Sequence, residues 1–207
     1  MKNIVRLLGL VIILSPNSAT AQETPGFEVF GGYSYLRLNP NINNAAYDNA
    51  ATIGNHGYHI SLLGNLNRHF GIAAEFVRHT GSRTVRASDF GGPVPPDTLA
   101  KFRVKSAALL FGPRFTARSE RTTLFGQVLL GGARTHLIVN APSFSTDGTR
   151  PGFAIALGGG LDLNLNRHLA FRVGQVEYIH VRYVSGFNGS QNDFQYSTGL
   201  VLRLGGR

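Results

Sequence analysis

The chain has 207 residues, with 20 Lys or Arg against 11 Asp or Glu, 26 Gly, 21 Phe or Tyr and no Cys. This length allows one domain or two, and the lack of Cys excludes disulfides, thiolate metal sites and a cysteine nucleophile. Only 15% of the residues are charged and 43% are hydrophobic, which argues against disorder, while the many Gly disfavour helices.

The first 21 residues have the three parts of a secretory signal. Lys2 and Arg6 supply the positive start, residues 7–14 are apolar, and a polar stretch ends in the small-x-small pattern of Ala19-Thr20-Ala21. The apolar stretch is too short for a membrane anchor, which needs about 20 residues. We therefore predict a cleaved signal peptide at 1–21 and an exported domain at 22–207.

The remainder alternates apolar and small or polar residues with a period of two, which predicts an all-β chain. Clusters of Gly, Asn, Pro and Ser divide it into eight strand-like runs. These runs are 27–38, 57–66, 70–79, 102–116, 123–139, 153–164, 168–184 and 194–204.

Three of the runs do not keep one phase. In the fourth, Val104 and Leu109 fall on opposite parities, and the fifth and seventh lose their phase near 131–132 and 174–175. One extra residue in a strand reverses its two faces, so we predict a β-bulge in each of these three runs.

The connections alternate between short and long. The short ones are 65–69, 117–121 and 164–168, and the first and third share the sequence Asn-Leu-Asn-Arg-His, which we interpret as one kind of turn. The long ones are 39–56, 80–101, 140–152 and 185–193. An even number of long strands with this alternation predicts an eight-stranded antiparallel up-and-down transmembrane β-barrel with short periplasmic turns and long extracellular loops.

The two faces of the runs predict where the barrel meets lipid. The apolar face should meet the membrane, and the opposite face of small residues and isolated charges should line a narrow interior. Charges buried there must pair, because unpaired ones would be costly. Two interpretations remain open, a structural plug or a narrow ion path. The predicted polar network consists of Glu28, Glu75, Asp162, Arg172, Glu177 and Arg203.

Basic residues gather around the second long connection. Nucleic acid is not an expected partner of an exported chain, but a basic barrel rim suits the phosphates of lipopolysaccharide. A solvated rim without a ligand is the other interpretation. The residues are Arg78, Arg83, Arg86, Lys101, Arg103 and Lys105.

The sequence has no short motif of an enzyme or a cofactor site. We find no nucleophile elbow, no His pair at i and i+4 and no phosphate loop, and Gly158-Gly159-Gly160 lies within a strand pattern. We therefore expect no catalytic, cofactor or metal site. Several His lie near strand ends, but sequence alone does not place a nucleophile beside a base.

Four stretches resemble the bacterial outer-membrane β-barrel domain family, the broad OmpA-like and opacity-like group of eight-stranded barrels. They are 29–35 (VFGGYSY), 111–115 (FGPRF), 125–133 (FGQVLLGGA) and the stretch from Gly158 to Tyr178. The resemblance implies insertion into the outer membrane by the barrel assembly machinery, with roles from structural anchor to adhesion or small pore. We expect this chain, unlike full OmpA proteins, to have no peptidoglycan-binding domain after its eighth strand, and its last four residues, Leu-Gly-Gly-Arg, do not include the final aromatic residue that is common in the family.

We therefore expect a monomer in the outer membrane of a Gram-negative bacterium, with a structural or surface-interaction role through its loops. A narrow pore is one alternative. The other is a soluble periplasmic barrel with its apolar face inward around an apolar ligand.

Overall fold

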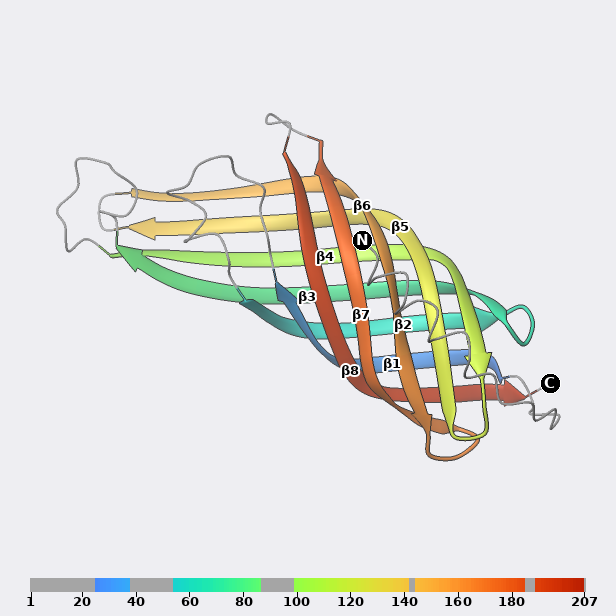
Figure 1. The fold of residues 1–207 in the computed structure, drawn as a ribbon. Helices are drawn as coiled ribbons and strands as arrows, with labels where there is room; N and C mark the ends of the chain where they lie inside the picture. Colours follow the sequence, from blue (N-terminus) through green and yellow to red (C-terminus); the bar gives the residue numbers. More distant parts are fainter. Residues whose placement is uncertain (1–24, 38–53, 87–98, 142–143, 185–188, 207) are drawn as a thin grey trace, which may run out of the picture.

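The computed structural model describes residues 25–37, 54–86, 99–141, 144–184 and 189–206, so the predicted signal peptide lies outside the described residues. Each strand pairs antiparallel with the next, and the first pairs with the last, which closes a barrel (Figure 1). No helix in these ranges is long and apolar enough to cross a membrane. The strands are β1 Pro25–Arg37, β2 Gly54–Asn65, β3 Phe70–Arg86, β4 Leu99–Arg118, β5 Thr122–Ala141, β6 Phe144–Asn164, β7 Leu169–Tyr183 and β8 Ser190–Gly206.

All eight predicted strands are confirmed, but two of the predicted long connections are partly wrong. β5 and β6 stay paired as far as Ala141 and Phe144, and β3 and β4 as far as Arg86 and Leu99. The apolar alternation fades there because the outward residues become polar, while the backbone pairing continues. The four strands β3–β6 thus form a paired sheet that projects beyond the rest of the barrel, at the left of Figure 1.

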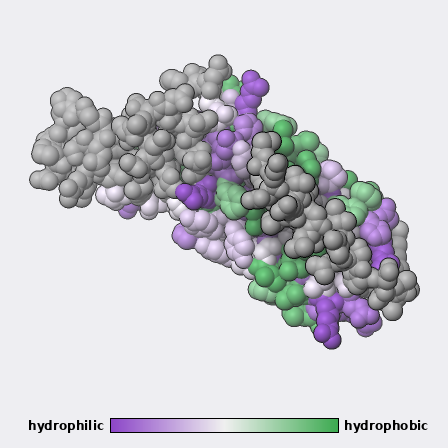
Figure 2. Space-filling model, in the orientation of Figure 1, coloured by the Kyte–Doolittle hydropathy of each residue, from purple (hydrophilic) through white to green (hydrophobic). Residues whose placement is uncertain are grey.

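The outer surface of the barrel is apolar. On β2, the outward Ile60 and Leu62 are 45% and 55% exposed, whereas His59 and Ser61 between them are buried. Figure 2 shows hydrophobic residues gathered along the barrel, with hydrophilic ones at its lower right end and toward the projecting sheet. This distribution suits lipid. It contradicts the soluble-barrel alternative, which needs the apolar face inside.

Only one of the three predicted bulges occurs in the described strands. The pairing of β7 with β8 shifts between Arg172 and Gln175, as predicted near 174–175. β4 and β5 pair without a shift. Val104 simply points inward and, like Leu110, belongs to an apolar cluster in the interior, so its change of parity relative to Leu109 needs no extra residue.

The two Asn-Leu-Asn-Arg-His segments form the same turn, as interpreted from the sequence. The Asn67 side-chain oxygen accepts hydrogen bonds from the backbone N–H of His69 and Phe70, both at 2.9 Å. Asn166 does the same for His168 and Leu169. The Asn side chains thus accept hydrogen bonds from backbone N–H groups within the turn, so each hairpin can close without a longer loop.

Candidate functional site

The interior of the barrel holds a network of charged and amide side chains. The structure places all six residues of the predicted network there, each at most 5% exposed. They do not form one chain of contacts among themselves. Instead, they divide into three groups that are completed by residues which the sequence analysis did not select.

The first group is centred on Arg172 of β7. Its guanidinium binds both carboxylate oxygens of Asp162, at 2.7 and 3.1 Å. It also lies 4.3 Å from the ring centroids of Phe30 and Phe125, which sandwich it. Phe30 is on β1 and Phe125 is on β5, and these strands face each other across an eight-stranded ring. The Phe–Arg–Phe stack therefore spans the lumen.

The second group is centred on Glu28 of β1. One carboxylate oxygen accepts hydrogen bonds from Arg118 at 2.5 Å and from Asn65 at 3.0 Å. The other lies 3.6 Å from the Nε of Arg203. Four strands are thus tied together near the end of the barrel that carries the short turns. The Glu28 carboxylate thus has two guanidinium partners, so this buried negative charge is paired.

The third group surrounds Glu75 of β3. Its Oε1 accepts hydrogen bonds from Arg114 at 3.0 Å, from Gln127 at 2.9 Å and from Gln175 at 3.1 Å. Arg114 was missed by the sequence analysis, although its position between outward Pro113 and Phe115 gives it the inward parity. Gln127 and Gln175 were missed because uncharged amides carry no signal for a buried network until the partners are known.

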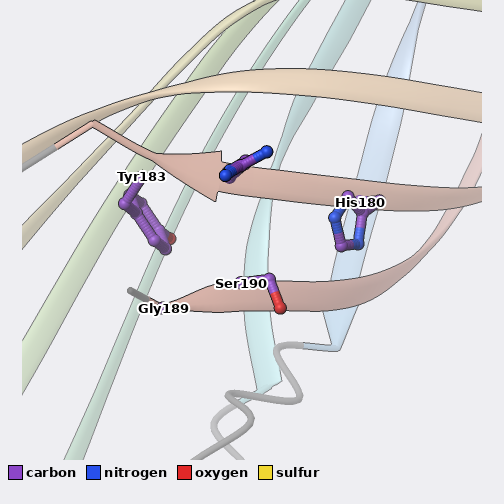
Figure 3. A pocket seen from close by; sticks show the side chains of 5 residues that line it. His180, Tyr183, Gly189 and Ser190 are labelled. Atoms are coloured by element: carbon purple, nitrogen blue, oxygen red, sulfur yellow. The ribbon is translucent and has the colours of Figure 1, made fainter. Parts of the chain in front are cut away.

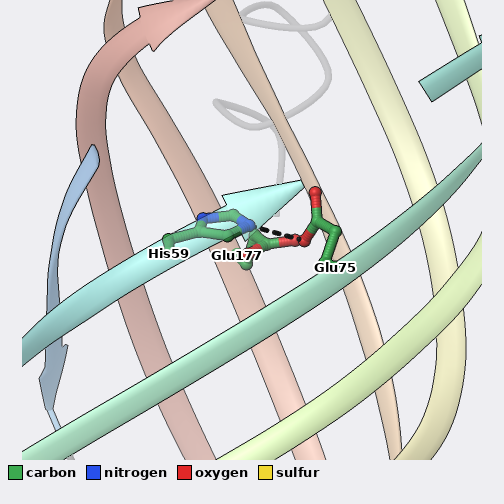
Figure 4. Close-up of side chains that lie close together, drawn as sticks. All are labelled: His59, Glu75 and Glu177. Carbon is green, nitrogen blue, oxygen red and sulfur yellow. Dashed lines mark ion pairs between the residues drawn. The ribbon is translucent and has the colours of Figure 1, made fainter. Parts of the chain in front are cut away.

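His59, Glu75 and Glu177 converge from β2, β3 and β7 (Figure 4). All three are buried, and one potential ligand atom from each lies within 4.8 Å of the others. The Nε2 of His59 is 3.2 Å from the Oε2 of Glu75. Glu177 accepts hydrogen bonds from Gln127 and Gln195, both at 2.8 Å. Sequence analysis anticipated no metal site because these residues are far apart in the chain.

A chain of short polar side chains continues from His59 toward the projecting end. Its Nδ1 is 3.1 Å from the Oγ of Ser197, which is 2.9 Å from the Oγ of Ser34. Ser34 is in turn 2.9 Å from the Nε2 of His79. These contacts place side chains in the order Ser197, His59, Glu75, as in a Ser–His–Glu catalytic triad. Ser197 and His59 are both fully buried, however, which leaves no room for a substrate.

The second predicted set, the basic residues, lies mainly on the outer face of the projecting sheet. Arg78, Lys101 and Arg103 are exposed, and Lys105 is half-buried. Arg83 and Arg86 belong to β3, but their side chains lie outside the described part of the structure. Three more exposed Arg that were not selected from the sequence lie at this end of the barrel, namely Arg134 on β5 of the projecting sheet, Arg37 on β1 and Arg182 on β7.

A pocket of about 350 Å³ opens where β7 meets β8, next to this basic face (Figure 3). His180, Arg182, Tyr183, Gly189 and Ser190 line it. His180 binds Asn192 at 2.7 Å through its Nδ1, and the Tyr183 hydroxyl is held by Gln191 at 2.7 Å and lies near Thr135. Arg182 and Ser190 are therefore the groups best placed to meet an anion there.

Three solved structures illustrate the likeness of this fold to known barrels. Ail, the attachment invasion locus protein of Yersinia pestis, has a TM-score of 0.53 and 16% identity over 86% of this chain and 99% of that one. Neisserial surface protein A has a TM-score of 0.54 and 11% identity, covering 86% and 97% of the two chains. OprG from Pseudomonas aeruginosa has a TM-score of 0.53 and 14% identity, covering 89% and 98%. At such identities the likeness concerns the fold.

The family comparison is more direct. The model of the outer membrane protein beta-barrel domain matches residues 7–205, nearly the whole chain. A search of curated proteins finds no match. The closed barrel, its apolar outer face and this match agree with one another: the chain belongs to the outer membrane β-barrel family and resides in the bacterial outer membrane.

Proposed function

We propose that this protein is a plugged, non-catalytic outer-membrane barrel that binds polyanionic carbohydrate, bearing phosphate or sulfate groups, on its projecting sheet. The observation that carries the proposal is the row of basic side chains on the outer face of that sheet. In barrels of this kind the longer connections lie outside the cell, so the row would face the lipopolysaccharide layer and the surroundings.

The row is built by strand alternation. Lys101, Arg103 and Lys105 follow one another at every second position of β4 and so share one face. Their partners on β3 are uncharged: Lys105 pairs with Thr80 and Arg103 with Ser82. The cations therefore have no acid beside them on that strand and keep their charge available for a ligand.

The charge balance of the whole projecting sheet points the same way. Residues 80–86, 99–107, 134–141 and 144–151 hold seven Lys or Arg and a single acid, Asp147. That acid lies 3.5 Å from His136. Such a one-signed surface attracts polyanions over about 10 Å at moderate salt.

One structural relative offers a parallel for the ligand class. Ail of Yersinia pestis, which has the same fold at 15% identity, has been crystallised with the heparin analogue sucrose octasulfate. This supports a sulfated or phosphorylated sugar as the type of ligand to test first. The low identity means that the binding residues of the present chain must be found from its own surface.

The interior supports a plug rather than a pore. The sandwich of Arg172 between Phe30 and Phe125 and the contacts of Glu75 with β5 and β7 cross the lumen at two places. An eight-stranded barrel has little space beyond its own side chains. Ligands would then bind at the outer surface, and the buried contacts of Ser197, His59 and Glu75 would stabilise the fold rather than catalyse a reaction.

The test measures the binding of sucrose octasulfate to the detergent-solubilised protein by titration calorimetry at two salt concentrations. Lys101→Ala, Arg103→Ala and Lys105→Ala combined should weaken binding at least about tenfold and reduce its salt dependence. The matched control removes three exposed Arg from the short-turn end, Arg68, Arg121 and Arg167. Equal affinity of the first variant and the wild type would contradict the proposal.

A second arm distinguishes a soluble sugar from lipopolysaccharide as the source of the anion. The apolar outer surface of the barrel ends just before Arg78, Arg134 and Arg182, so these residues suit phosphates at the membrane surface. Lys101 and Arg103 lie farther out along the strands. Replacing the first three with Ala should weaken binding to vesicles containing lipopolysaccharide but spare sucrose octasulfate. Loss of sucrose octasulfate binding in this variant, with vesicle binding unchanged, would contradict this assignment of the two groups of residues.

A further inference from the structure

The cluster of His59, Glu75 and Glu177 contains two buried atoms without a hydrogen-bond partner. These are the Nε2 of His59 and the Oε2 of Glu75, in side chains that are 0% and 1% exposed. They lie 3.2 Å apart, a distance that makes an ion pair only if His59 is protonated, and no hydrogen bond joins them. Buried polar atoms are nearly always satisfied, so such a pair calls for an explanation.

The neighbouring hydroxyl groups suit one tautomer of His59. Ser197 donates its hydroxyl hydrogen to the Oγ of Ser34 at 2.9 Å, so its lone pairs can accept a hydrogen from the Nδ1 of His59, 3.1 Å away. In the neutral tautomer with the proton on Nδ1, the Nε2 is a bare lone pair that faces a carboxylate oxygen.

The negative charge at this point also exceeds its partners. Gln127 donates through one nitrogen to both carboxylates, at 2.9 Å to Glu75 and 2.8 Å to Glu177, so the two acids lie close together. Arg114 pairs with Glu75. Among the described residues, Glu177 has no ion pair with Lys or Arg, and only amides bind it. A buried carboxylate without a cation is expensive.

We propose that His59, Glu75 and Glu177 bind one divalent transition-metal ion of the zinc class inside the barrel. One imidazole nitrogen and two carboxylates form a donor set of the type that zinc accepts. Two ligands at about 2.0–2.1 Å from a tetrahedral zinc ion lie about 3.3 Å apart, which matches the 3.2 Å between the Nε2 of His59 and the Oε2 of Glu75. The ion satisfies both orphan atoms and supplies the missing cation for Glu177.

The three ligands come from β2, β3 and β7, so the ion would join opposite walls of the barrel. Because the site is fully buried, it can form only as the chain folds, and metal binding is then coupled to folding. The ion would act as a structural staple within the plug.

The experiment refolds the full chain from urea into detergent micelles with excess ZnCl₂, followed by removal of free metal with a chelator and measurement of bound zinc. The folded protein should retain about one zinc per chain. X-ray absorption at the zinc edge should show one nitrogen ligand and the rest oxygen. His59→Gln and Glu177→Gln should each reduce retained zinc at least about tenfold, since each removes a ligand. Glu177→Gln keeps the pairing of Glu75 with Arg114, so it is the variant better suited to fold.

The control is His136→Gln, which removes a His from the outer rim and should leave zinc binding unchanged. Each variant is first shown to fold by its gel mobility before and after boiling. A folded wild-type chain that retains no zinc would overturn the proposal, as would full retention in folded Glu177→Gln. In the first case, nitrogen-15 NMR showing both ring nitrogens of His59 protonated would identify a proton as the missing cation.

Discussion

Glu75 of β3 and Gln175 of β7 are joined by a hydrogen bond of 3.1 Å, although three strands separate them in either direction around the barrel. The bond therefore crosses the lumen. Gln127 of β5 reaches the same carboxylate oxygen from a third wall. The interior of this protein is thus held by contacts between distant strands.

Arg172→Ala should strongly destabilise the barrel. The change leaves Asp162 as a buried carboxylate without its cation and opens a gap between Phe30 and Phe125. Removal of one partner of a buried pair costs about 3–5 kcal/mol. Urea unfolding in lipid vesicles measures this loss. Arg167→Ala, which alters an exposed turn residue, is the control, and a loss below about 1 kcal/mol for Arg172→Ala would contradict the role given to the stack.

Leu157→Arg should hinder insertion, because Leu157 lies on the outer face of β6 and is 60% exposed to the expected lipid. An Arg at the middle of the membrane costs about 2–4 kcal/mol in such barrels. Leu165→Arg is the matched control: Leu165 is equally exposed but lies in the turn after β6. The comparison uses unfolding free energies in vesicles, and equal effects of the two substitutions would argue against the assigned membrane face.

Gly158→Ala should disturb the cluster at Glu177. A Cβ at position 158 would lie 2.5 Å from the Cγ of Glu177 and 2.5 Å from the backbone oxygen of Val176, so the carboxylate would have to move. We expect reduced zinc retention and a loss of stability of about 1–3 kcal/mol. Gly132→Ala meets nothing within 4 Å and should be neutral. Similar zinc retention in both variants would place Glu177 outside the metal site.

The lipid-facing side of the fold was predictable because strand alternation is a local property that sequence displays directly. Ile60 and Leu62 are apolar at every second position, and the structure has them on the surface. The ends of β5 and β6 were not predictable in this way. Beyond the membrane both faces of a strand are polar, so residues such as Thr149 and Arg150 look like a loop although their backbone is paired.

The interior was only partly predictable for a different reason. Isolated acids and Arg on the small-residue face, such as Asp162 and Arg172, stand out from their neighbours. The pairing between strands that brings His59 to Glu75 and Glu177 depends on the register and the closure of the barrel, which no single strand displays. Arg114 was overlooked because the run 102–116 was interpreted as changing phase, and Arg118 because it fell in the predicted short connection 117–121, whereas β4 continues to Arg118.

The most direct test of the plugged barrel is a planar-bilayer recording of the protein after its fold has been established by a boiling-dependent shift on a gel. We expect no discrete current steps from a barrel whose interior is crossed by the Phe30–Arg172–Phe125 stack and by the bonds of Glu75. Reproducible ohmic openings from the folded wild-type protein would contradict the proposed plug and would make the interior a conduction path.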